Sequence, residues 1–347
     1  MRSLRAAAVG LAAALLLAGC GTSTPQSELG GEPFALPTGP TTWEQTSPAW
    51  LLDGTLHVGE QQVRLGRDAE QFVLGATGAY WVRGSDLVFT SVEGETQEVA
   101  PTGWGNIAIS ADHRVFATVD QSRGPTDEYG THVMQVAAFD TRTGEQLYRT
   151  PDEEPDRSDD LADLYSETMP LLDGVSDTRL FHAGRTIELD DGSSVPWNTD
   201  PQGGNVYEGY DGALFPDGYR VPVRKRGDRL VLGDSEAWGT GRLSPDRSTL
   251  FDVTQWPARA VAYDAETGER RQVDAPWDHL LLGPFDDEGS FTAIAQLIKP
   301  RAMTVVRAQQ VVQCEVATLR CVTVSPVVPT ADDAYPPLFL ESGEGFY

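Results

Sequence analysis

The stretch Trp104-Gly-Asn-Ile-Ala-Ile-Ser-Ala-Asp-His-Arg-Val-Phe-Ala-Thr-Val-Asp-Gln121 occurs again as Trp238-Gly-Thr-Gly-Arg-Leu-Ser-Pro-Asp-Arg-Ser-Thr-Leu-Phe-Asp-Val-Thr-Gln255. The two copies align without a gap at an offset of 134 residues, and their Trp, Gly, Ser, Asp, Val and Gln residues are identical. Downstream, Ala138-Phe-Asp-Thr-Arg-Thr-Gly-Glu145 matches Ala262-Tyr-Asp-Ala-Glu-Thr-Gly-Glu269 at an offset of 124. An insertion around Ser122–His132 explains the change of offset. The chain therefore contains a repeated structural unit.

Each copy begins with a short strand and a Ser-x-Asp turn. The turn contains Ser110 and Asp112 in the first copy, and Ser244 and Asp246 in the second. Ser and Asp side chains in such a turn bond nearby backbone N–H groups, and an apolar strand follows.

The second turn of each copy has the pattern Asp-x-x-Thr-Gly. It starts at Asp140 or Asp264, and it ends at Gly144 or Gly268. Glycine adopts positive φ without a steric penalty, which is what a tight hairpin requires. Each copy thus predicts the order strand, turn, strand, turn, strand.

The spacing of the copies indicates how many units the chain holds. An offset of 134 is about three units of ~45 residues, close to the length of a four-stranded propeller blade. We therefore expect two blades between the copies, with strands at Val175–Phe181, Thr186–Leu189, Tyr219–Val223 and Arg229–Leu232. Degenerate units that bring the expected total to six or seven blades lie at Leu52–Leu56, Asp86–Phe89, Phe285–Gly289 and Ala302–Arg307.

These motifs resemble those of WD-repeat-like and Tol-type propellers, in which Ser-Pro-Asp-Gly turns precede an apolar strand and an Asp-x-x-Thr-Gly hairpin closes the blade. Ser244-Pro-Asp246 and Asp264–Gly268 carry the resemblance, whereas His113 and Arg247 stand where the turn glycine would be. The resemblance implies an all-β fold, a β-propeller, over residues 49–347. The alternative is two copies of a strand-turn-strand unit in a β-sandwich.

The first twenty residues have the pattern of an export signal. Arg2 and Arg5 precede an apolar or small stretch, Ala6–Ala18, which is shorter than the ~20 residues needed to cross a bilayer. Leu17-Ala-Gly-Cys20 then resembles the bacterial lipobox, which implies cleavage before Cys20 and a diacylglyceryl group on its thiol. We expect a signal peptide at 1–19 and a lipid anchor at Cys20 that holds the protein on the extracytoplasmic face of the cell membrane. An ordinary secretory signal is the alternative.

The residues after Cys20 are poor in apolar side chains. Gly21–Pro48 contains five prolines, many Thr, Ser and Gly residues, and three charges. Such a composition does not form a core, so we expect residues 20–48 to be a flexible tether.

The charge of the chain excludes one class of partner. The 347 residues include 26 Lys and Arg against 52 Asp and Glu, a net charge of −26. This charge repels phosphate backbones, so we expect no nucleic acid partner.

The two remaining cysteines bracket a short turn. If Ala317-Thr318 forms a two-residue turn, Cys314 and Cys321 face each other on paired strands, and export permits a disulfide between them. The spacing does not fit a redox Cys-x-x-Cys site, and no nearby His or further Cys completes a zinc site.

The sequence contains no clear catalytic motif. Gly-x-Ser-x-Gly is absent, and the five histidines have no metal-ligand spacing. The acidic stretch Pro151–Asp163 is either a calcium loop or a solvated insertion, with Arg157 where a calcium loop would have glycine. We expect no cofactor and no metal. The expected function is a protein-binding or ligand-binding scaffold that uses one propeller face; the alternative is an exported glycan or peptide hydrolase or lyase with carboxylates at the channel mouth.

Overall fold

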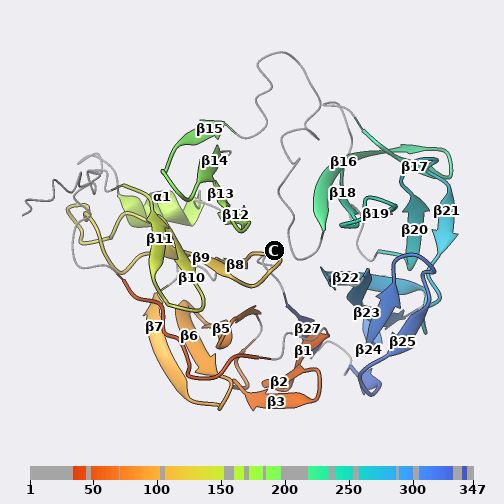
Figure 1. Cartoon of the computed structure of the whole chain (residues 1–347), viewed down its shortest axis with the longest axis horizontal. Helices are drawn as coiled ribbons and strands as arrows, with labels where there is room; N and C mark the ends of the chain where they lie inside the picture. Colours follow the sequence, from red (N-terminus) through yellow and green to blue (C-terminus); the bar gives the residue numbers. More distant parts are fainter. Residues whose placement is uncertain are drawn as a thin grey trace, which may run out of the picture.

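The chain folds as a β-propeller of six antiparallel sheets arranged in a ring (Figure 1). The computed structural model describes residues 34–43, 48–69, 71–101, 106–151, 160–167, 172–182, 185–196, 218–233, 239–252, 258–286, 289–299, 305–330 and 338–341. The strands are β1 (Ala49–Leu52), β2 (Thr55–Val58), β3 (Gln61–Arg64), β4 (Phe72–Gly75), β5 (Gly78–Arg83), β6 (Asp86–Ser91), β7 (Thr96–Pro101), β8 (Ile107–Ile109), β9 (Val115–Asp120), β10 (Gln135–Asp140), β11 (Gln146–Arg149), β12 (Leu172–Val175), β13 (Arg179–His182), β14 (Arg185–Glu188), β15 (Ser194–Pro196), β16 (Tyr219–Arg226), β17 (Arg229–Leu232), β18 (Gly239–Leu243), β19 (Thr249–Asp252), β20 (Val261–Asp264), β21 (Arg270–Gln272), β22 (His279–Phe285), β23 (Ser290–Ile298), β24 (Val306–Glu315), β25 (Cys321–Thr323), β26 (Val328–Pro329) and β27 (Leu338–Leu340).

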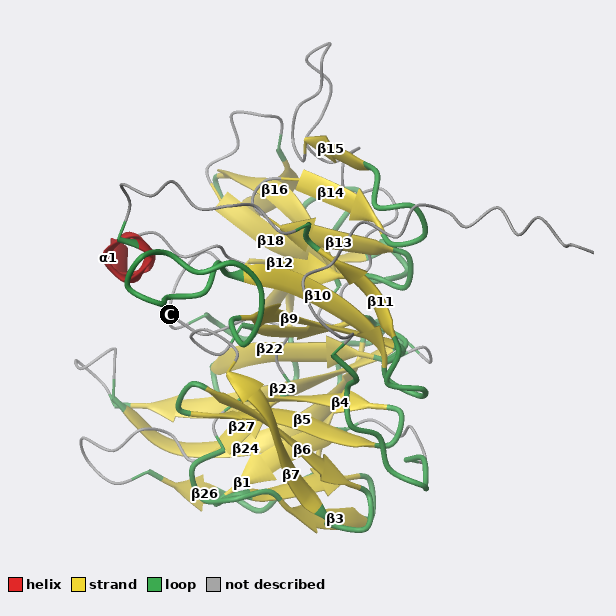
Figure 2. Cartoon of the chain, turned by 90° about the vertical axis from the view of Figure 1, so that its left-hand side faces the viewer, coloured by secondary structure: helices red, strands yellow, loops and turns green. Residues whose placement is uncertain are grey.

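The sheets follow the chain order around the ring, with one exception. Sheet 1 has the order β27-β1-β2-β3, so the last strand completes the first sheet. Sheets 2, 3 and 4 contain β4–β7, β8–β11 and β12–β15. Sheet 5 has the order β17-β16-β18-β19-β20-β21, and sheet 6 contains β22–β25 with β26 paired to β24. Figure 2 shows the sheets from the side, with the helix α1 (Leu161–Glu167) projecting beyond them.

The core lies between neighbouring sheets. Strands β4, β8 and β9 are buried at every residue, so their side chains contribute to the core on both faces of the sheet. Leu51 and Phe72 belong to the cluster that joins sheets 1 and 2, and Tyr80 and Phe116 to the one that joins sheets 2 and 3. Further clusters join sheets 3 and 4, sheets 5 and 6, and sheets 6 and 1.

One hairpin turn recurs between the last two strands of several sheets. In sheet 3 the N–H of Gly144 donates to the carbonyl of Asp140, and in sheet 5 Gly268 bonds Asp264 in the same way, at 2.8 Å in both. Gly144 has φ of 74° and Gly268 has φ of 72°. Gly192 in sheet 4 makes the equivalent bond to Glu188.

The same turn closes β24 and β25 in sheet 6. Leu319 takes the glycine position with φ of 56°, and its N–H donates to the carbonyl of Glu315. The turn is a four-residue loop, not the expected two-residue turn at Ala317-Thr318, because Val316 and Leu319 are drawn into the core, 2% and 1% exposed. Cys314 and Cys321 still face each other and form a disulfide on the outermost strand pair of the sheet.

The region between the two repeat copies differs from the expectation of two blades. The structure has one complete sheet there, sheet 4, followed by the β16–β17 hairpin. The hairpin pairs with β18, and its Val221, Val223 and Leu230 pack on Leu243 and neighbouring side chains of sheet 5. The described part of this region therefore supplies two strands where a second blade was expected, and the ring has six sheets.

The expected tether also needs correction. Residues 34–43 lie against the propeller as a strap: Phe34, Leu36 and Trp43 are 9%, 3% and 5% exposed. The N–H of Leu36 donates to the carbonyl of Gly144, and the hydroxyl of Tyr80 donates to the carbonyl of Pro37. Phe34 and Leu36 pack in the apolar cluster between sheets 2 and 3, and Trp43 packs in the one between sheets 1 and 2. The red segment of Figure 1 crosses sheet 2 on this path.

Candidate functional site

The turn residues selected from the sequence do not converge on one site. Ser110 lies in sheet 3 and Ser244 in sheet 5, and each accepts a backbone hydrogen bond within its own turn. The N–H of Val115 donates to Ser110 Oγ at 2.9 Å, and the N–H of Thr249 donates to Ser244 Oγ at 3.0 Å. Their hydroxyls donate to Asp112 and Asp246. These residues form turns within their own sheets.

The Asp-x-x-Thr-Gly residues have a similar structural role. Asp140 Oδ1 accepts the N–H of Thr143, and Asp264 Oδ1 accepts the N–H of Thr267. These hydrogen bonds hold the pKa of the Asp264 carboxyl below its ordinary value. The disulfide cysteines lie in sheet 6, and Cys20 lies outside the described residues.

A long loop of sheet 3 and the helix α1 form one connected surface. Its β9–β10 loop (residues 121–134) contains the insertion found by comparing the two repeat copies. The carboxylate of Asp127, 7% exposed, lies inside this loop and accepts the N–H groups of Tyr129 and Thr131 at 2.9 and 2.8 Å. Its other oxygen accepts the N–H of Leu161, the first residue of α1, at 3.0 Å. One carboxylate thus joins the loop to the helix.

A second contact joins the same two segments. The hydroxyl of Tyr165 on α1 accepts the N–H of Met134 at 2.9 Å. The helix is started by Asp160, whose Oδ1 accepts the N–H groups of Ala162 and Asp163, as an N-cap does. We refer to residues 121–134 together with α1 as the loop–helix surface.

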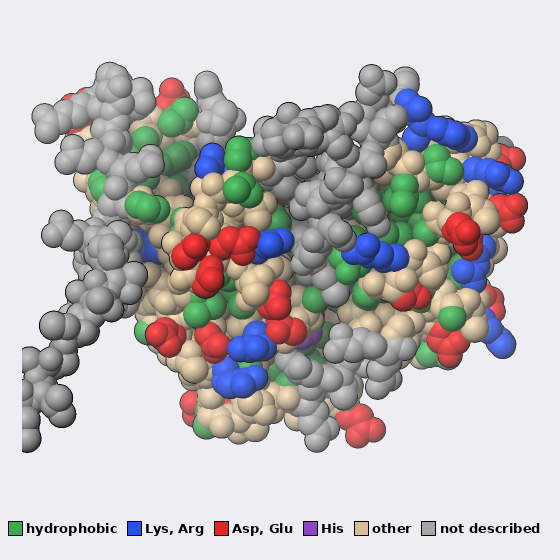
Figure 3. Space-filling model, turned by 45° about the horizontal axis from the view of Figure 1, so that its top comes forward, with side chains coloured by type: hydrophobic (Ala, Val, Ile, Leu, Met, Phe, Trp, Pro, Cys, Tyr) green, Lys and Arg blue, Asp and Glu red, His purple; other side chains and the backbone are tan. Residues whose placement is uncertain are grey.

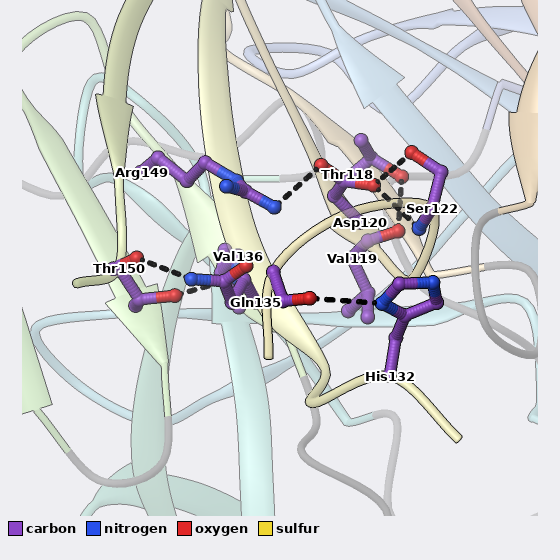
Figure 4. Close-up of polar contacts among 10 residues, drawn as sticks. Thr118, Val119, Asp120, Ser122, His132, Gln135, Val136, Arg149 and Thr150 are labelled. Carbon is purple, nitrogen blue, oxygen red and sulfur yellow. Dashed lines mark hydrogen bonds and ion pairs between the residues drawn. The ribbon is translucent and has the colours of Figure 1, made fainter. Parts of the chain in front are cut away.

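An ion pair holds the base of this surface. Arg149 Nη2, at the end of β11, lies 3.0 Å from Asp120 Oδ2 at the end of β9, and their side chains are 4% and 2% exposed (Figure 4). Asp120 Oδ1 also accepts the N–H and the hydroxyl of Ser122. Figure 4 shows Gln135 beside this pair, where its Nε2 donates to the carbonyl of Thr150. The loop therefore starts and ends on fixed strand ends.

The outer side of the loop–helix surface carries apolar and acidic groups. Tyr129 is 68% exposed and Leu164 is 44% exposed, whereas most large apolar side chains of the described residues are buried. The carboxylates of Glu128 and Asp160 raise the pKa of Tyr129, so its ring stays neutral in an acidic neighbourhood. Exposed aromatic groups on a rigid support are typical of binding surfaces.

Charge is unevenly distributed over the molecule. Figure 3 shows a group of Lys and Arg side chains at its upper right, with Asp and Glu side chains beside them, and a further group of Asp and Glu side chains nearer the middle. In the described ranges no group of three His, Cys, Asp or Glu side chains is arranged to hold a metal ion. No described helix is long and apolar enough to span a bilayer.

A separate polar contact links the closing strand to the ring. Glu341 follows β27, and its side chain is 2% exposed. One carboxylate oxygen accepts the N–H of Leu74 in sheet 2 at 2.5 Å, and the other lies 3.1 Å from His113 Nε2 in sheet 3. Because all three partners belong to different sheets, we assign this contact to ring closure.

Sequence reasoning located the insertion but not the residues that order it. Asp127 and Leu161 are far apart in the sequence, and no motif marks either of them. The changed offset between repeat copies was the available signal.

The strand pairing defines the class of the molecule as a β-propeller. No protein-family model matches the sequence, and no curated protein matches it. Similar solved structures include a protein described as TolB from Agrobacterium tumefaciens, with 9% identity over 79% of this chain and 86% of that one, at a TM-score of 0.33. TolB from Acinetobacter baumannii has 10% identity over 78% and 61% of the two chains (TM-score 0.36), and the AfRom2 CNH domain 8% over 77% and 96% (TM-score 0.36). At this identity the likeness concerns the fold alone.

Proposed function

We propose that this protein is a lipid-anchored extracytoplasmic scaffold that binds a partner through the loop–helix surface and performs no catalysis. The observation that carries the proposal is the exposure of Tyr129 and Leu164 on segments that Asp127 holds in place. The carboxylate of Asp127 pairs backbone N–H groups of both segments, so Tyr129 and Leu164 are exposed on a fixed support.

The anchoring part of the proposal rests on the sequence. The charged start, the apolar stretch and Leu17-Ala-Gly-Cys20 together fit a lipidated cysteine. A lipid on Cys20 would keep the propeller at the membrane and leave its loops available for a partner.

The experiment is chemical crosslinking of the lipidated protein in its native membrane, followed by mass spectrometry of the captured proteins. We expect reproducible partners that are lost in Cys20→Ala, which is not retained at the membrane, and reduced in Tyr129→Ser. The matched control is Val322→Ser, because Val322 is similarly exposed (63%) but lies on sheet 6. Capture that is unchanged in Tyr129→Ser would rule out the loop–helix surface as the binding site.

A further inference from the structure

We propose that the partner of the loop–helix surface is a membrane-embedded protein, and that it binds through an extracytoplasmic segment with basic residues around an apolar side chain. This inference rests on the proposed function. It adds the class of the partner and the reason for it, which is the position of the strap (residues 34–43) relative to the anchor and to the surface.

The strap is fixed to sheets 2 and 3 along its length. The ring of Phe34 packs edge-on against Phe139, with centroids 5.2 Å apart. Further along, Gly39 N donates to Thr77 Oγ1 at 2.8 Å and Trp43 N to the carbonyl of Ala76 at 3.2 Å. Apolar burial at both ends and these hydrogen bonds make the strap part of the folded propeller.

The strap begins beside the loop–helix surface. The guanidinium of Arg123, in the β9–β10 loop, lies over the ring of Phe34 at 5.7 Å from its centroid, a cation–π contact. The first packed residue of the strap therefore touches the loop that carries Tyr129. Figure 1 shows the red segment starting at the edge of the ring where the yellow loop of sheet 3 lies.

The chain between the anchor and the strap is short. Cys20 and Phe34 are separated by 13 residues, Gly21–Pro33. A chain of this length reaches at most roughly 50 Å. Because residues 34–43 pack on the propeller, only the residues before Phe34 separate it from Cys20. The edge of sheet 3, where the strap begins, is therefore the part of the propeller nearest the lipid anchor.

Charge selects between possible occupants of the surface. Glu128, Asp160 and Asp163 are exposed on the loop and the helix, around Tyr129 and Leu164. Carboxylates repel anionic lipid headgroups, so the bilayer itself is a poor occupant. A basic protein segment has the complementary charge, and a protein embedded in the same membrane is the partner within reach.

The test uses the full-length protein in its native membrane with a photo-crosslinking residue at position 164, and at position 322 as the control. We expect position 164 to crosslink an integral membrane protein and position 322 not to. Inserting 40 Gly and Ser residues after Gly31 increases the number of residues between Cys20 and Phe34 about fourfold, so the crosslink should fall about 5–10-fold. Crosslinking to a soluble protein, no crosslink, or no effect of the insertion would overturn the inference.

A charge-reversed variant tests the chemistry of the partner. Glu128→Lys with Asp163→Lys should reduce the crosslink at least tenfold, whereas Glu60→Lys with Asp68→Lys, exposed acids near sheet 1, should leave it unchanged. Equal effects of the two pairs would contradict a basic partner. Membrane fractionation of the wild-type protein and of Cys20→Ala is a separate readout. If the wild-type protein is not membrane-bound, the proposed function fails. If it is membrane-bound but the crosslink does not depend on linker length, only the inference fails.

Discussion

Gly144 shows how one residue connects backbone geometry to the packing of a distant segment. Its φ is 74°, and a Cβ atom placed there would lie 2.1 Å from the carbonyl oxygen of Leu36. Gly84 has a similar φ of 61° but open space around the same position. An alanine at position 84 would therefore meet only the strain of the backbone conformation. An alanine at position 144 would meet the same strain and also a steric clash with Leu36.

We expect Gly84→Ala to lower the free energy of unfolding by roughly 1–2 kcal/mol, the cost of a left-handed backbone for an L-residue. Gly144→Ala should cost more and should also release the strap. The measurements are urea unfolding and limited proteolysis within residues 34–43. Equal losses of stability and equal proteolysis in the two variants would show that the strap does not depend on Gly144.

The sequence predicts the backbone conformation at turn positions where the residue is glycine. Gly144 and Gly268 were expected at positive φ, and they are found there. His113 and Arg247, which replace the turn glycine, keep the left-handed conformation with φ of 57° and 60°. Leu319 could not be foreseen, because a leucine adopts that conformation only where burial of its side chain compensates for the strain.

Acidification should loosen the loop–helix surface before the sheets. Burial opposes the ionised form of Asp127, but the backbone N–H groups that point at the carboxylate outweigh it and hold its pKa below the ordinary value of 3.8. A lowered folded-state pKa means that the carboxylate stabilises the fold above the ordinary pKa, and that this is lost as the pH falls through the folded-state value.

The measurement is amide hydrogen exchange of Thr131 and Leu161, compared with Ala117 in β9, at pH values from 6 down to 2. Protection of Thr131 and Leu161 should be lost first, below pH about 4, after allowance for the intrinsic exchange rate. The Asp127→Asn variant should show the loss already at pH 6. Simultaneous loss at all three amides would argue against a local carboxylate effect.

At the scale of the element, the disulfide closes a short hairpin in sheet 6. Cys314 and Cys321 lie seven positions apart in the sequence. Loop-closure entropy for a ring of this size predicts a loss of about 2–3 kcal/mol in the free energy of unfolding when the bond is removed. The Cys314→Ser, Cys321→Ser double variant should show this loss in denaturant unfolding, and added reductant should have no further effect on it. An unchanged midpoint would mean that the hairpin is fully stabilised by packing of Val316 and Leu319.

The strap was missed as an element for a physical reason. Phe34, Leu36 and Trp43 are isolated among Pro, Thr and Gly residues, so local composition favours a tether. The partners of Phe34 and Leu36 lie between sheets 2 and 3, and those of Trp43 lie between sheets 1 and 2, outside the strap itself. The loop–helix surface could not be predicted for the same reason, because Asp127 accepts the N–H of Leu161, which is distant in the sequence. The repeats in the sequence predict the strands, but they do not predict which other segments of the chain pack against those strands.

At the scale of the whole molecule, ring closure depends on β27 and the glutamate that follows it. Glu341 is buried and bonds Leu74 and His113, so Glu341→Ala leaves a buried N–H without a partner. Such a loss costs about 1–3 kcal/mol in the free energy of unfolding. The exposed Glu60→Ala is the matched control and should change the free energy of unfolding by less than about 0.5 kcal/mol. Equal values for the two variants would show that Glu341 is not part of the closure.

The number of sheets was predictable only within a range. The offset of 134 residues was interpreted as three units, but the two copies lie in sheets 3 and 5, only two sheets apart. The strands at Val175–Phe181 and Tyr219–Val223 were expected in the region between the copies. The joining of β16 to β18 within one sheet could not be read from the period, because a hairpin and a blade share the same alternation of apolar side chains. The pairing of Leu340 with Trp50 is equally invisible to a local pattern.

The pairing of β27 with β1 also has a consequence for biosynthesis. Because the innermost strand of sheet 1 is the last strand of the ring, sheet 1 stays incomplete while the preceding residues emerge, and Trp50 and Leu52 then lack Leu338 and Leu340, on which they pack. A nascent chain of this design cannot finish folding from its leading end. Sheet 1 should therefore stay open until residues 338–341 have been synthesised.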